Sequence, residues 1–138
     1  MHRWIEHTAE VELEVDASSA EEVFAEAALA LGELIATEEE TAAGARAARR
    51  EISIAAPDLA TLLADWLQEL VFLADTEGLV PERVAHLALG EDREGHSLVA
   101  AVEGVTDAAR PLVKAVTYHR LELNEKDGSW RARVTFDV

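Results

Sequence analysis

Acidic side chains near both ends of the sequence are the residues whose type and spacing could perform chemistry. The stretch HTAEVELEV (residues 7–15) alternates apolar and polar positions, and the polar ones include Glu10, Glu12 and Glu14. The final residues, SWRARVTFDV, alternate in the same way and include Asp137. A period of two is typical of strands that bury one face. Because calcium and magnesium prefer carboxylate oxygens, these residues indicate a candidate site for a divalent cation.

The two acidic segments would form one site if their strands were antiparallel neighbours. One register sets three pairs of polar residues opposite each other: Glu10 and Asp137, Glu12 and Thr135, and Glu14 and Arg133. Glu14 and Arg133 would attract each other, whereas Glu10 and Asp137 would repel each other unless a cation bound between them. The carboxylate at Val138 could add a third acidic group. The alternative left open by periodicity is an ordinary solvated face with a frayed terminus.

Composition and charge restrict the classes of function. The chain has 138 residues, and 28 Asp and Glu against 12 Lys and Arg give a formal net charge of −16. So acidic a chain repels a polyphosphate backbone, and we therefore expect basic protein partners or cations and no direct binding of nucleic acid. The chain has no cysteine and no apolar run long enough to span a membrane, so we expect a cytoplasmic protein without disulfides.

The elements that must position these residues follow from hydrophobic spacing. A first helix is expected after Ser18 or Ser19, either of which has a glutamate three residues later, and its apolar stripe continues to residue 35. A loop to about residue 50 and a strand at 51–56 precede a second helix, which starts with Pro57 and Asp58 and ends near Gly78. Further strands are expected at 83–89, 97–104, 112–123 and 130–138. This order predicts one domain over residues 1–138 of the α+β class, a two-layer sandwich of two main helices on a mostly antiparallel sheet.

Four fragments in the same order make the sequence similar to the archease family. HTAEVELEV with the following EEVFAEAALAL resembles the opening of that family, and LLADWLQELVFLADTEGLV resembles its middle helix. VKAVTYH and the terminal FDV resemble its C-terminal motifs. The family usually has Asp where this chain has Glu10. Glutamate keeps the charge and the oxygens but reaches one methylene further, which a flexible calcium shell accommodates better than a strictly octahedral magnesium shell.

The resemblance implies a protein cofactor and not an enzyme. Its expected partner is the RtcB-type tRNA-splicing RNA ligase, which uses GTP and manganese, and its expected role is to promote guanylylation and multiple turnover of that ligase. The resemblance also implies a metal site formed by Glu10, Asp137 and Val138, the last through a main-chain or terminal oxygen. We expect calcium there, with magnesium and manganese as alternatives.

Four other polar residues are candidates for support of this site or for partner contact: His7, Lys114, Tyr118 and His119. In a regular strand, Lys114 and Tyr118 share one face and His119 lies on the other, which disfavours a catalytic Lys–His pair unless a bulge intervenes. Two other functions remain open from the residues alone. One is a metal-dependent hydrolase, and the other is a general chaperone-like calcium-binding module.

Overall fold

The computed structural model describes residues 1–37 and 45–138, apart from the side chain of His7. These residues form two helices and seven strands: β1 (His2–His7), β2 (Glu10–Ala17), α1 (Ala20–Ile35), β3 (Arg46–Ala56), α2 (Leu59–Glu77), β4 (Val80–Asp92), β5 (Gly95–Thr106), β6 (Ala115–Lys126) and β7 (Ser129–Asp137). Within the described ranges, neither helix has the combination of length and apolar character needed to cross a lipid bilayer.

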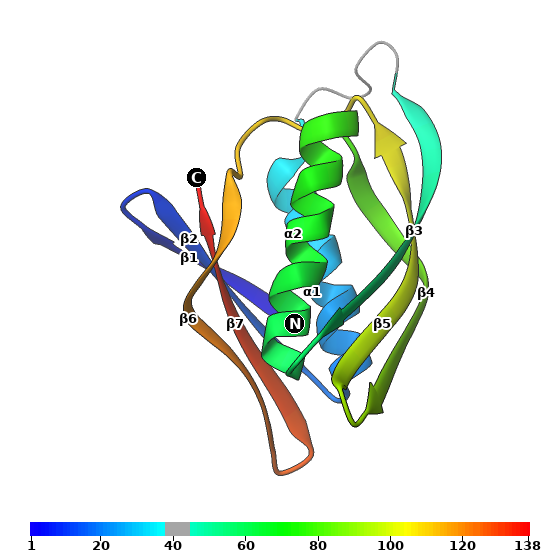
Figure 1. Ribbon diagram of the computed structural model, residues 1–138. Coiled ribbons are helices and arrows are strands. Elements are labelled where there is room, and N and C mark those ends of the chain that lie inside the picture. The colour runs from blue at the N-terminus through cyan, green and yellow to red at the C-terminus, as the bar shows by residue number, and fades with distance from the viewer. Residues whose placement is uncertain (38–44) are drawn as a thin grey trace.

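The strands form two antiparallel sheets, and the helices lie between them (Figure 1). One sheet has the order β1-β2-β7-β6, and the other has the order β3-β5-β4. Helix α1 contacts β2 and β4, and α2 contacts β6 and β3, so each helix packs on both sheets. The predicted α+β class, with two helices on antiparallel sheet structure, is confirmed. The strands are divided between two sheets where one was expected, because alternation shows that a strand buries one face without showing which strands are its neighbours.

Local chemistry fixes where the helices begin and end. The Ser19 hydroxyl accepts a hydrogen bond from the Glu22 amide at 3.1 Å, which caps the N-terminus of α1. Asp58 Oδ1 accepts from the Thr61 amide at 2.8 Å and caps α2 in the same way. This hydrogen bonding from Thr61 favours the carboxylate form and lowers the pKa of Asp58. Helix α2 ends at Gly78, whose φ of 66° is the left-handed conformation that glycine adopts without strain.

The core lies between the sheets, around the two helices. Phe24 of α1 and Trp66 of α2 are fully buried, and Trp66 Nε1 donates a hydrogen bond to the Phe24 carbonyl oxygen at 2.9 Å. At Gly32, α1 approaches β4 so closely that a Cβ would lie 2.2 Å from the carbonyl oxygen of Pro81. Only glycine permits this approach, and it therefore sets the distance between α1 and the three-stranded sheet.

Strand ends differ from the prediction throughout, since the strand expected at 112–123 is Ala115–Lys126, and two differences are larger. The expected strand at 7–15 is two strands, β1 and β2, joined by a turn in which Ala9 has a φ of 60°. A loop was expected up to about residue 50, and residues 38–44 of it lie outside the described residues. From Arg46 onward the prediction is wrong, because β3 begins there and pairs with β5 along its whole length. The Arg- and Ala-rich segment lacks apolar alternation. Its strand conformation comes from the ladder with β5 and from contacts such as that of Arg49 with Glu103.

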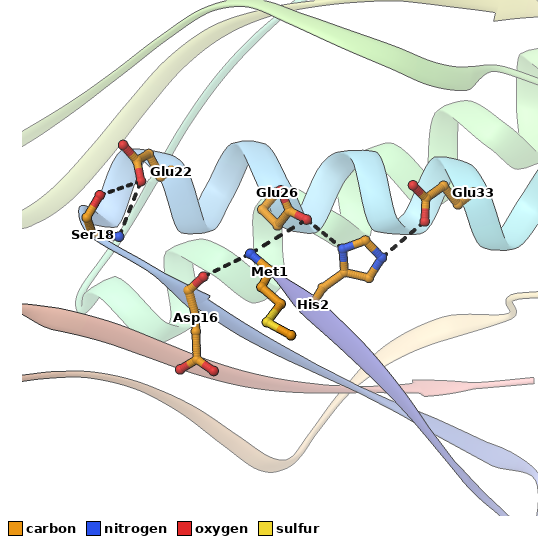
Figure 2. A network of polar contacts seen from close by, with 7 residues as sticks. All are labelled: Met1, His2, Asp16, Ser18, Glu22, Glu26 and Glu33. Carbon is orange, nitrogen blue, oxygen red and sulfur yellow. Dashed lines mark hydrogen bonds and ion pairs between the residues drawn. The ribbon is translucent and has the colours of Figure 1, made fainter.

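The β1–β2 hairpin is anchored to α1 by a histidine. Figure 2 shows the ring of His2 between two glutamates of α1. His2 Nδ1 lies 2.6 Å from Glu26 Oε1, and Nε2 lies 3.0 Å from Glu33 Oε2. These contacts fix the outer strand of the four-stranded sheet, and with it the hairpin that leads into Glu10.

Candidate functional site

The first and last parts of the sequence meet in the four-stranded sheet. Strand β2 pairs antiparallel with β7 in the predicted register, with three polar pairs opposite each other: Glu10 and Asp137, Glu12 and Thr135, and Glu14 and Arg133. Figure 1 shows the β1–β2 turn beside the C-terminal end of β7. Glu10 and Asp137 are therefore direct cross-strand neighbours at this end of the sheet, as the sequence predicted.

Main-chain hydrogen bonds hold the backbone on both sides of Asp137. The Val138 amide donates to the Ala9 carbonyl oxygen at 3.1 Å, and the Lys114 amide donates to the Asp137 carbonyl oxygen at 2.8 Å. The second bond occupies the main-chain oxygen of Asp137 and leaves its carboxylate for other partners. Because the strands and the turn fix the backbone, the segments that carry Glu10 and Asp137 are organised before any ion binds.

The ligand set available at this place suits a hard cation. Within residues 1–37 and 45–138, excluding the His7 side chain, no group of three or more His, Cys, Asp or Glu side chains could hold a metal ion. Glu10 and Asp137 are half-buried, and the third protein ligand that the family resemblance implies is a main-chain or terminal oxygen of Val138. Calcium and magnesium accept such mixed oxygen ligands and complete their shells with water, whereas zinc sites use His and Cys. The main chain of His7 lies opposite Glu10, but the role expected of its side chain falls outside the described part.

Glu12, the next acidic residue on the same face, is buried, which the sequence did not predict. Its side chain is 6% exposed, and its Oε1 atom lies 3.6 Å from Arg133 Nε and 4.0 Å from Arg120 Nη1. Thr135, directly opposite, is also buried, and neither its hydroxyl nor Arg133 Nε has a hydrogen-bond partner in the described structure. Two guanidinium groups thus compensate the charge of Glu12. We therefore assign Glu12 to this buried cluster and not to the candidate cation site.

The expected ion pair between Glu14 and Arg133 is wrong, although their register is confirmed. Glu14 Oε2 lies 2.5 Å from Nη2 of Arg3 on β1. The Arg133 side chain lies instead within 3.6 Å of the carboxylates of Glu12 and Glu122. The prediction considered only the β2–β7 pair, whereas both strands have a second neighbour in the sheet that competes for the same side chains.

A large bulge in β6 brings Arg120 close to the side chain of Glu12. The pairing of β6 with β7 stops after Thr117 and resumes at Glu122, so residues 118–121 lie opposite a single residue of β7. Arg120 has a φ of 57°, and the His119 amide donates to the Thr117 hydroxyl at 3.0 Å. A bulge redirects side chains and interrupts an exposed sheet edge. The regular alternation assumed for residues 112–123 therefore fails within the bulge.

The remaining candidates have separate neighbours. Lys114 precedes β6 and contacts the Glu10–Asp137 end of the sheet through its main chain. The Tyr118 hydroxyl donates to Asp65 Oδ1 on α2 at 3.0 Å, and this bond, with partial burial, raises the pKa of Tyr118. His119 lies exposed in the bulge. Lys114 thus lies beside the end of β7 and Tyr118 beside α2, and no described contact joins Lys114, Tyr118 and His119.

Comparison with known proteins identifies the family. The model of the Archease protein family matches residues 2–138. Protein archease of Methanosarcina mazei is 32% identical to this chain over 142 residues, which cover 99% of this chain and 95% of that protein. Protein archease of Methanothermobacter thermautotrophicus is 36% identical over 132 residues, which cover 86% of this chain and 84% of that protein.

Solved structures agree with the sequence comparison. The solution structure of Methanobacterium thermoautotrophicum protein 1598 matches with a TM-score of 0.77 at 31% identity and covers 99% of this chain and 98% of that one. The crystal structure of a Thermotoga maritima archease, described as a possible chaperone, matches with a TM-score of 0.64 at 22% identity and covers 100% of this chain and 98% of that one, which shows a shared fold. From the family model, the relatives and the fold together, the chain belongs to the archease family.

Proposed function

We propose that this chain is an activator of a GTP-dependent RNA ligase of the RtcB type, and that it promotes guanylylation and multiple turnover of that ligase in tRNA splicing. The observation that carries the proposal is the match of the archease family model to residues 2–138. In this role the chain acts as a protein cofactor, and the ligase holds the GTP, the RNA and the catalytic histidine.

The charge of the chain supports a protein partner. An RNA ligase needs basic surface to hold a polyphosphate backbone. A chain with a net charge of −16 is attracted to such a protein and repelled by the RNA that the ligase binds. Association with the ligase should therefore weaken as salt concentration rises.

A divalent ion, calcium in our proposal, binds Glu10, Asp137 and the main-chain oxygen of Val138. The cross-strand position of the two carboxylates supports this site, since like charges directly opposite each other destabilise a sheet unless something compensates them. The bound ion would tie the β1–β2 turn to the end of β7. That would fix the conformation of this end of the molecule, where the ligase would bind.

The proposal is tested by mixing the purified chain with an RtcB-type ligase, manganese and labelled GTP, and by measuring how fast the ligase becomes guanylylated. We expect faster labelling of the ligase, no label on this chain, and loss of the effect in Asp137→Asn. Asp127→Asn is the matched control, because it removes the same charge from the β6–β7 turn at the other end of β7.

Other outcomes would favour the alternative functions. If the isolated chain hydrolyses the labelled GTP, and Asp137→Asn abolishes this hydrolysis, the metal-dependent hydrolase is favoured. Protection of unrelated unfolded proteins from aggregation, without any effect on the ligase, would favour the general chaperone-like module. An unchanged rate of ligase guanylylation with the wild-type chain would refute activation directly.

A further inference from the structure

The solvent side of helix α2 carries an exposed aromatic residue among acidic ones. Phe72 is 55% exposed, although large apolar side chains usually lie inside. Its helical neighbours three and four residues away are all polar: Gln68, Glu69, Asp75 and Thr76. The whole helix contains four acidic residues and no Lys or Arg. Phe72 is thus an apolar contact point surrounded by polar groups, two of which are negatively charged.

Strand β6 runs beside this face and adds a second exposed aromatic ring. The Val116 amide donates to Gln68 Oε1 at 2.9 Å, and the Tyr118 hydroxyl donates to Asp65 Oδ1 at 3.0 Å. These bonds fasten the start of β6 to α2, and Figure 1 shows the two elements next to each other. Tyr118 is 61% exposed. Because Asp65 and Phe72 are seven residues apart, they share one face of α2, and Tyr118 lies at one end of it.

We use the name α2–β6 seam for the surface formed by five residues: Asp65, Glu69, Phe72, Asp75 and Tyr118. A hollow of about 680 Å³ opens at its Phe72 end, and its charged lining residues include Asp75, Glu77, Arg110 and Lys114. The Lys114 amide is bonded to the carbonyl oxygen of Asp137. The seam therefore continues from the bulge of β6 to the Glu10–Asp137 end of the sheet.

The acidic residues of the seam form no ion pair with a Lys or Arg in the described part of the chain, although Arg110 and Lys114 line the hollow beside Asp75. Glu77, at the C-terminal end of α2, pairs with Arg50 of β3, and that pairing lowers the pKa of Glu77. No Lys or Arg among residues 1–37 and 45–138 forms an ion pair with Asp65, Glu69 or Asp75. These carboxylates are left to solvent or to a partner with positive charge.

We propose that the α2–β6 seam is the surface that docks on the ligase, and that it receives a basic segment of the ligase with exposed Arg or Lys side chains. This inference rests on the proposed function. Guanidinium and ammonium groups bind the faces of aromatic rings and form charge-assisted hydrogen bonds with neighbouring carboxylates, so Phe72 and Asp75 together suit such a segment. A second copy of the chain is the wrong occupant, because a two-fold contact would oppose two acidic rims. The position of the seam would bring the ligase next to the ion site.

Binding of the chain to the RtcB-type ligase, measured by calorimetry at low and at moderate salt, tests the seam. We expect Phe72→Ala to weaken binding by about tenfold or more, as for aromatic anchors of other interfaces. We expect a variant with both Glu69→Gln and Asp75→Asn to bind more weakly at low salt and to lose much of the salt dependence. Two controls lie on the other sheet: Val99→Ala removes another exposed apolar side chain, and Glu51→Gln removes another exposed charge.

The possible results separate the seam from the proposed function. If Phe72→Ala and the double variant fold and bind the ligase as the wild type does, the seam is refuted and the activator function stands. If the wild-type chain does not bind or activate the ligase, both proposals fail. If light scattering shows that Phe72→Ala converts a dimer of this chain into a monomer, the seam belongs to a second copy and the ligase proposal for it is overturned.

Discussion

Replacing Asp137 with Asn should change the stability of the protein in opposite directions without and with calcium. Directly opposite residues in an antiparallel pair have Cβ atoms about 5 Å apart, and two unit charges at that distance in water repel by about 0.8 kcal/mol. The carboxylates of Glu10 and Asp137 can turn away from each other, so the measured cost should be about 0.2–1 kcal/mol. Without a metal ion, Asp137→Asn should therefore raise the unfolding temperature by about 1–4 °C for a domain of this size.

Calcium should reverse that order. A ligand present at 100 times its dissociation constant stabilises the folded state by about 2.7 kcal/mol, provided that it does not bind the unfolded chain. The wild type should gain this stabilisation, and Asp137→Asn should gain much less because it lacks one charged ligand. The measurement is thermal unfolding by circular dichroism in EDTA and in calcium, repeated with magnesium and manganese, with dissociation constants from calorimetric titration.

The control for this experiment is Asp127→Asn, which changes the net charge equally. Asp127 has a φ of 53°, a conformation that Asn tolerates, so this variant should fold normally and keep the full calcium effect. The reasoning is refuted if the wild type unfolds at the same temperature in EDTA and in all three metals. It is also refuted if Asp137→Asn gains as much from calcium as the wild type does.

Three further predictions concern individual hydrogen bonds. Trp66→Phe removes the donor that satisfies the buried carbonyl of Phe24 and should cost about 1–3 kcal/mol of unfolding free energy in urea titrations, so a neutral effect would contradict the role of this bond. The folded state lowers the pKa of Asp58, so the charge of Asp58 stabilises the protein at pH values above the ordinary pKa near 4. This stabilisation disappears as the pH falls through the lowered pKa. The urea midpoints of the wild type and of Asp58→Ser should therefore converge in acid. Tyr118 is the only tyrosine, so ultraviolet titration reports it directly, and Asp65→Asn should lower its pKa toward about 10, whereas an unchanged titration would contradict the bond to Asp65.

The sequence predicted the part of the candidate site that depends on pairing between two strands. Alternation in both segments restricts the register to shifts of two residues, and each shift changes which charges meet. The register with Glu10 opposite Asp137 is the one observed. The cap of α1 was predictable as Ser18 or Ser19, because it depends on residues within one helical turn, whereas Asp58 was expected inside α2 and is its cap.

The features that the sequence did not predict depend on contacts among three or more elements. The burial of Glu12 requires Arg133 from β7 and Arg120 from the bulge of β6, and neither is visible in the alternation of β2. The bulge requires Arg120 to adopt the left-handed backbone conformation, and residues 118–121 contain no Gly or Asn that would indicate it. The separation into two sheets likewise depends on tertiary contacts, because both sheets pack on the same two helices. A strand with one apolar face could belong to either sheet.

The position of β7 has a consequence for how the protein is made. Strand β7 lies between β2 and β6, yet it follows every other strand in the sequence. The β1–β2 hairpin is synthesised before β7, and pairing Ala17 with Trp130 closes a loop of about 110 residues. Such long-range pairing is slow, so the three-stranded sheet, which is complete at residue 106, has time to form first. The Glu10–Asp137 end of the sheet therefore forms only after β7 has been synthesised and has paired with β2.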